Sequence, residues 1–72
     1  AIIVGKLIAM WRQERGVERW ILVEDSQGRQ LKLQIPPGVE KQIEERGAFA
    51  IPRPLHFEVR FEGNRLLCEG FY

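Results

Sequence analysis

Turn-forming residues interrupt this chain at short intervals, and their spacing restricts its 72 residues to a fold built from short strands. Clusters of glycine, proline and asparagine favour tight turns and loops. They fall at Glu14-Arg15-Gly16, Ser26-Gln27-Gly28, Pro36-Pro37-Gly38, Gly47, Pro52-Arg53-Pro54 and Gly63-Asn64. Five strand-like runs and one helical run lie between them, which predicts a single, mainly β domain over residues 1–72.

The predicted strands cover residues 2–13, 17–25, 30–35, 55–62 and 65–72. The third run alternates most clearly, because Leu31, Leu33 and Ile35 are apolar while the residues between them are polar. Such alternation is typical of a strand with one face in the core and the other in solvent. Gly5, inside the long first run, indicates a bend or a bulge.

A short amphipathic helix is predicted between the third and fourth strands. Val39 and Ile43 stand four residues apart and are surrounded by charged or amide side chains. Gly47 then has the residue type that commonly ends a helix in the left-handed conformation. We therefore expect two to three helical turns before Gly47.

Loop lengths predict how the first strands pair. A three-residue loop with Gly16 in the left-handed region joins the first and second strands. The resulting pairs are Lys6 with Glu24, Ile8 with Leu22, Met10 with Trp20, and Arg12 with Glu18. Trp11 is expected at the edge of the core, with Arg19 opposite it as a cation–π partner.

The second loop, ending at Gly28, sets Ile21 opposite Leu33 and Val23 opposite Leu31. Since the apolar face of the third strand should form the core, Ile21 and Val23 are expected to point inward. By alternation, Trp20 points outward with the polar side chains of the third strand.

Gly63-Asn64 suits a two-residue turn with glycine first, joining the last two strands. The predicted pairs are Glu62 with Arg65, Phe61 with Leu66, Val59 with Cys68, and Phe57 with Gly70. This register keeps the apolar side chains of both strands on one face.

Composition argues against several classes of protein. Eleven basic and ten acidic residues give a net charge of +1, which lacks the basic excess usual in nucleic-acid-binding domains. No apolar run approaches the roughly 18 residues of a membrane span. The single cysteine, Cys68, cannot form an internal disulfide, so we expect a cytoplasmic location.

The residues needed for catalysis are nearly absent. The chain has one serine, one cysteine, one histidine, one aspartate and no threonine. A nucleophilic site needs a nucleophile, a base and an orienting group, and Asp25 and Ser26 share one tight turn. His56 and Cys68 are expected on opposite sheet faces and are too few for a closed metal site. We therefore expect no enzyme activity, no metal and no cofactor.

The order of three strands, a helix and two strands, with a long bent first strand, resembles the oligonucleotide/oligosaccharide-binding (OB) fold over the whole chain. The segment from Trp20 to Gly28 resembles the aromatic/aliphatic-x-x-x-x-Asp-x-x-Gly hairpin of nucleic-acid-binding OB domains. The resemblance implies a small five-stranded antiparallel barrel. The alternative is an SH3-like barrel, which would lack a helix at residues 38–46.

The resemblance also implies a ligand across the second and third strands, flanked by loops at residues 13–16 and 63–65. Single-strand binding needs aromatic platforms for bases and cations for phosphates, and the resemblance implies that Trp20 stacks on a base. The predicted site consists of Trp20, Leu22, Lys32, Gln34, Met10 and Arg12 on one face, with Arg15 and Arg65 in the flanking turns. We expect a module that binds single-stranded DNA or RNA.

A protein-interaction module is the alternative function. An outward Trp20 with Leu22, Ile8 and Met10 would form an apolar patch, and such patches often mark partner sites. An exposed strand edge could also pair with another chain or a second copy. Tryptophan in so small a domain is usually well buried, so the orientation of Trp20 is the decisive point.

Overall fold

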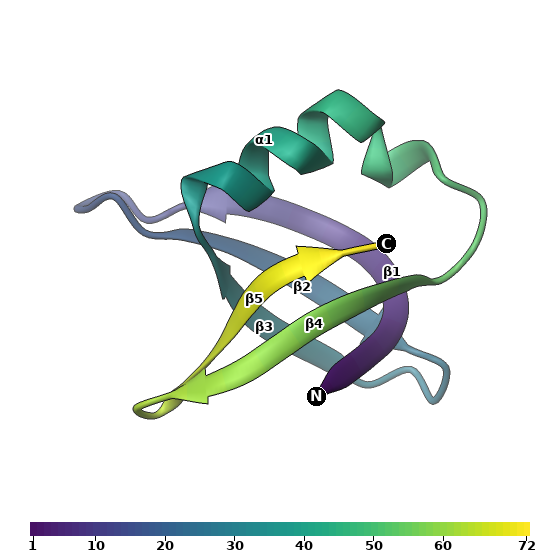
Figure 1. Cartoon of the computed structure of the whole chain (residues 1–72). Coiled ribbons are helices and arrows are strands. Elements are labelled where there is room, and N and C mark those ends of the chain that lie inside the picture. Colours follow the sequence, from purple (N-terminus) through teal and green to yellow (C-terminus); the bar gives the residue numbers. More distant parts are fainter.

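The computed structural model describes residues 1–72 as a closed five-stranded barrel with one α-helix (Figure 1). The elements are β1 (Ile2–Arg12), β2 (Arg19–Asp25), β3 (Gln30–Ile35), α1 (Pro37–Arg46), a 3₁₀ turn η1 (Ala48–Ala50), β4 (Leu55–Glu62) and β5 (Arg65–Phe71). The strand order around the barrel is β1-β2-β3-β5-β4. The predicted five-stranded barrel with a helix between β3 and β4 is thus confirmed. The ten-residue helix α1 decides against the SH3-like alternative.

The sequence predicted a wholly antiparallel barrel, and this prediction is wrong at one junction. β3 and β5 run parallel and share one register pair, Gln34 with Leu67. Parallel neighbours need a crossover connection, which here consists of α1, η1 and β4. The contact between β3 and β5 is therefore the least extensively paired junction of the barrel.

β1 closes the barrel by changing partners along its length. Its first residues pair with β4 and the remainder pairs with β2, and Gly5 lies opposite both Leu55 and Asp25. A Cβ atom at Gly5 would overlap the backbone carbonyl of Glu24. Glycine is required here because the two strands approach too closely for a side chain, which explains the predicted bend.

The core lies inside the barrel and under α1, which crosses one end in Figure 1. Ile21 and Val23 are fully buried, as the register of the second hairpin predicted. Val39 and Ile43 are the buried residues of α1. Gly47 ends the helix in the left-handed conformation at φ 58°, as predicted.

The predicted register of the first hairpin is correct near Lys6 and Glu24 and wrong beyond them. A β-bulge between Leu7 and Ala9 shifts the remaining pairs by one residue. Met10 therefore faces Ile21, not Trp20, and Leu22 faces Ala9, not Ile8.

The loop explains this shift. The Gln13 N–H donates to the Glu18 carbonyl oxygen at 3.0 Å, so the loop spans residues 14–17. Gly16 does not have the positive φ that the shorter loop predicted. The loop is one residue longer than predicted, and the bulge adds one residue to β1, so both halves of the strand stay paired with β2.

The last hairpin follows the prediction near its turn. Phe61 faces Leu66 and Val59 faces Cys68, and Gly63 has a φ of 66°. A second irregularity then sets Phe57 opposite Phe71, so the predicted pair with Gly70 is wrong. The extra residue on β5 is Glu69, whose carboxylate lies 3.3 Å from the Arg60 guanidinium.

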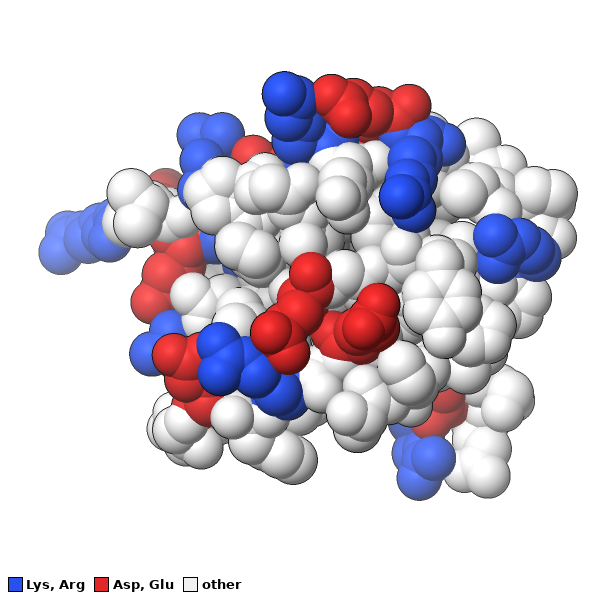
Figure 2. Space-filling model, in the orientation of Figure 1, with Lys and Arg blue, Asp and Glu red and all other residues white.

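Charge is unevenly placed on the side of the molecule formed by β4 and β5. Figure 2 shows acidic side chains near the centre of this side, with basic ones mainly towards the margins.

None of the helices has the length and hydropathy that a membrane span requires.

Candidate ligand-binding face

The outer face of β2 and β3 holds the residues that the sequence placed there. Trp20 lies opposite Gln34 and Leu22 lies opposite Lys32. Trp20 alternates along β2 with the buried Ile21 and does not belong to the core cluster. The predicted outward orientation of Trp20 is therefore confirmed.

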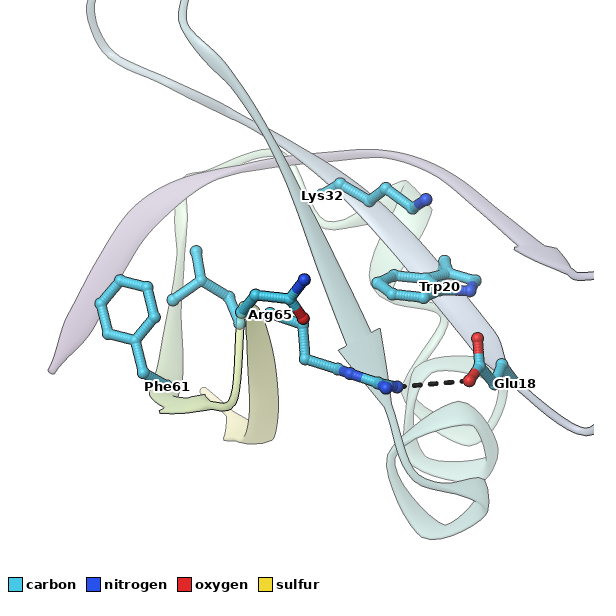
Figure 3. Close-up of a pocket in the computed structure, with 7 residues that line it drawn as sticks. Glu18, Trp20, Lys32, Phe61 and Arg65 are labelled. Carbon is cyan, nitrogen blue, oxygen red and sulfur yellow. Dashed lines mark hydrogen bonds and ion pairs between the residues drawn. The ribbon is translucent and has the colours of Figure 1, made fainter.

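The Trp20 indole is nevertheless covered, since only 8% of the residue is exposed. The Lys32 Nζ atom lies 4.1 Å from its ring centroid and 6.0 Å from that of Trp11. Such contacts are cation–π interactions, in which the ammonium is attracted to the electron-rich ring face. In Figure 3 the Lys32 side chain runs along one side of the Trp20 ring, while Glu18 lies near its indole nitrogen edge.

Trp11 is the member of this face that sequence reasoning missed. The bulge places it directly opposite Trp20, and 36% of it remains exposed. Trp11 was expected at the core edge because, in a strand without a bulge, Met10 would lie opposite Trp20. The available signal was the length of β1, since a strand that bends around two partners commonly contains a bulge.

The same bulge removes two predicted residues from the face. Met10 packs against the core cluster. Arg12 lies opposite Arg19, and both guanidinium groups contact the Glu40 carboxylate of α1, at 3.5 and 2.7 Å. The predicted pairing of Arg12 with Glu18 is therefore wrong, and both arginines serve the junction with the helix.

Arg65, in contrast, reaches the predicted face from the β4–β5 turn. Its Nη1 donates to Gln34 Oε1 at 2.7 Å. The same atom donates to Glu18 Oε1 at 3.2 Å, the contact dashed in Figure 3. It thereby connects the hairpin to β3 and to the residue that immediately precedes β2. Arg15 lies exposed in the loop at residues 14–17, away from these contacts.

Two hollows adjoin this bridge. The first, of about 560 Å³, includes Trp20, Lys32 and Phe61 in its lining. The second, of about 600 Å³, includes Val17 and Gln34. Glu18 and Arg65 line both hollows, so their ion pair stands at the boundary between them.

The indole nitrogen of Trp20 is buried and has no hydrogen-bond partner. An unpaired buried N–H is unfavourable, since it has lost water without gaining another acceptor. A ligand with an acceptor oxygen or nitrogen can pair with this N–H only after the side chains that cover it move away.

The remaining reactive side chains lie elsewhere. His56 stacks on Tyr72 with ring centroids 4.8 Å apart, whereas Cys68 is fully buried in the core. Burial raises the pKa of the Cys68 thiol to about 11, which keeps it protonated near neutral pH. The structure contains no group of three or more metal-ligating side chains.

The chain has no significant match among protein-family models, curated proteins or solved structures. The barrel is compatible with an OB-like fold.

Proposed function

We propose that this chain is a non-enzymatic OB-type module that binds single-stranded DNA or RNA on the outer face of β1, β2 and β3. The observation that carries the proposal is the grouping of two indoles around one lysine, beside an arginine-bridged hollow. Aromatic platforms for bases together with cations for phosphates are the requirements for single-strand binding.

Binding would begin at Trp11, whose ring is the more accessible of the two. A second base reaches Trp20 when the Lys32 side chain swings away from its ring. This exchange is feasible, because a cation–π contact over a covered ring contributes about 2 kcal/mol while each stacked base contributes about 1–3 kcal/mol. The displaced Lys32 ammonium then becomes available to a backbone phosphate.

The charge distribution supports this choice of face. Helix α1 carries the exposed Glu44 and Glu45, and Figure 2 shows acidic side chains near the centre of the side formed by β4 and β5. These carboxylates repel a polyanion. The face with Lys32 and Arg65 is therefore the more favourable approach for a nucleic-acid strand.

The direct test is titration with oligothymidylate and oligouridylate, followed by intrinsic tryptophan fluorescence. Stacking should quench the emission, and Trp11→Ala should weaken binding by about 1–3 kcal/mol. Phe49→Ala removes an exposed aromatic ring outside this face and serves as the matched control. Unchanged fluorescence at high micromolar oligonucleotide would exclude the proposal.

A protein partner is the second candidate for the same face. Ile8 and Trp11 are exposed large apolar side chains on β1, and Leu22 on the neighbouring strand is only half-buried. Exposed apolar area of this kind also suits a protein contact. This function predicts association that is insensitive to salt, lost in Trp11→Ala, and unaffected by oligonucleotide, as measured by sedimentation.

A further inference from the structure

The bridge from Arg65 to Glu18 joins parts of the chain that the barrel hydrogen bonds leave separate. The two residues are 47 positions apart. Glu18 immediately precedes β2 and Arg65 begins β5, and β3 lies between these two strands. Only Gln34 and Leu67 are paired between β3 and β5. The tip of the β4–β5 hairpin is consequently held to this face by the side chain of Arg65.

The guanidinium of Arg65 is only partly used by these contacts. Both hydrogen bonds come from the same nitrogen, Nη1, while its Nε and Nη2 atoms make none. Arginine binds phosphate through two parallel N–H groups, a geometry that a single shared nitrogen leaves available. Glu18 therefore occupies Arg65 without using its paired donors.

The ion pair is also weak enough to exchange. The side chains of Arg65 and Glu18 are 43% and 35% exposed, and their closest atoms are 3.2 Å apart. Exposed pairs of this kind contribute at most about 1 kcal/mol. A phosphate that binds the free Nε and Nη2 atoms brings a second negative charge beside Glu18 and so favours release of the carboxylate from Nη1.

We infer that the Glu18–Arg65 pair is an autoinhibitory latch on the proposed nucleic-acid site. In the free protein, Glu18 holds Arg65 across the boundary between the two hollows. A phosphate of the bound strand replaces Glu18 as the partner of Arg65, and the two hollows then form one groove. The inference rests on the proposed function and concerns its regulation.

The test compares oligothymidylate binding by the wild-type protein, Glu18→Gln, Arg65→Gln and the double variant, at one fixed salt concentration. Glu18→Gln removes the competing charge and should tighten binding about two- to fivefold, the factor equivalent to a surface ion pair. The gain should disappear in the Arg65→Gln background, because there is then no guanidinium to release.

Glu24→Gln is the matched control. Glu24 lies on β2, whereas Glu18 immediately precedes that strand, and Glu24 contacts Gln30, not Arg65. It therefore reports the effect of removing one negative charge. A latch predicts a larger gain for Glu18→Gln than for Glu24→Gln. Equal gains, or a gain that persists without Arg65, would show a general charge effect and overturn the latch. No binding by any variant would instead overturn the proposed function, and the latch with it.

Discussion

Cys68 is fully buried on the inner side of β5, opposite Val59. Burial raises the pKa of its thiol from 9.0 to about 11, because the thiolate loses its hydration there. The stabilisation from keeping this thiol neutral is complete below about pH 9. It is lost as the pH rises through 11, since the unfolded chain ionises first.

The resulting prediction is that Cys68 in the native protein does not react with a thiol reagent such as dithionitrobenzoate at neutral pH. Reaction should begin only when urea unfolds the barrel, because the thiolate is the reactive form. Absorbance of the released thiolate measures this directly. Rapid labelling of the folded protein would show that the β5 interior opens readily.

Gly5 has a more severe constraint, because a Cβ atom there would overlap the Glu24 carbonyl. Gly5→Ala should lower the free energy of unfolding by about 2–3 kcal/mol, the upper part of the range for overpacking. Gly38→Ala is the control, since nothing lies within 4 Å of its added methyl group and the position is helical. It should stabilise by about 0.4–1 kcal/mol. Urea denaturation of both variants would check the contrast, and equal effects would contradict it.

Among the elements, α1 is attached to the barrel by a charge cluster as well as by its apolar side. Glu40 accepts a hydrogen bond of 2.7 Å from Arg19, and both side chains are only 16% exposed. Neutralising one member leaves the other charge partly buried, which is costlier than breaking a surface pair.

Glu40→Gln should therefore reduce the free energy of unfolding by about 1–2 kcal/mol, between the values for surface and buried pairs. Glu44→Gln changes an exposed residue of the same helix that makes no ion pair, and should alter stability by less than about 0.5 kcal/mol. Chemical denaturation followed by circular dichroism compares them. If both variants lost the same free energy of unfolding, the effect would come from the charge of the helix and not from the Arg19–Glu40 contact.

The elements were more predictable from sequence than the joints between them. Gly28, Gly47 and Gly63 all adopt the positive φ expected of them, so the second hairpin, the helix end and the last turn were correctly placed. The bulges at Ile8 and Glu69 were missed. Neither residue has a type that marks a bulge, because these irregularities arise from fitting strand length to barrel curvature.

The same limit applied to the candidate site. Alternation within β2 and β3 was enough to point Trp20 outward beside Lys32 and Gln34. The contact of the Lys32 ammonium with the indole could not be predicted. Strand alternation fixes the sheet face of a long flexible side chain but not the direction in which the chain extends over that face. Trp11 depended on the bulge and was therefore assigned elsewhere.

At the scale of the whole molecule, a net charge of +1 limits how strongly this protein can depend on electrostatics. On the proposed face only Lys32 and Arg65 can each meet a phosphate, since Arg12 and Arg19 contact Glu40. Two phosphates predict a slope of log affinity against log salt of about −1.4 for single strands.

Oligothymidylate titrations over a series of NaCl concentrations would measure this slope. Lys32→Gln should make it shallower by about 0.7, the contribution of one phosphate contact. Lys41→Gln, on the outer side of α1, serves as the control and should leave the slope unchanged. A wild-type slope several times steeper would indicate a far larger charged interface than this face provides.

The bulge at Ile8 divides β1 into two segments with separate duties. The amino-terminal segment seals the cylinder against β4, while the carboxy-terminal segment decides which ring stands beside Trp20. Removing the extra amino acid at this joint would give a regular ladder in which Leu7 still faces Val23 and Trp11 still faces Trp20. The molecule can thus lose this residue without changing either the seal or the ring that it displays to a ligand.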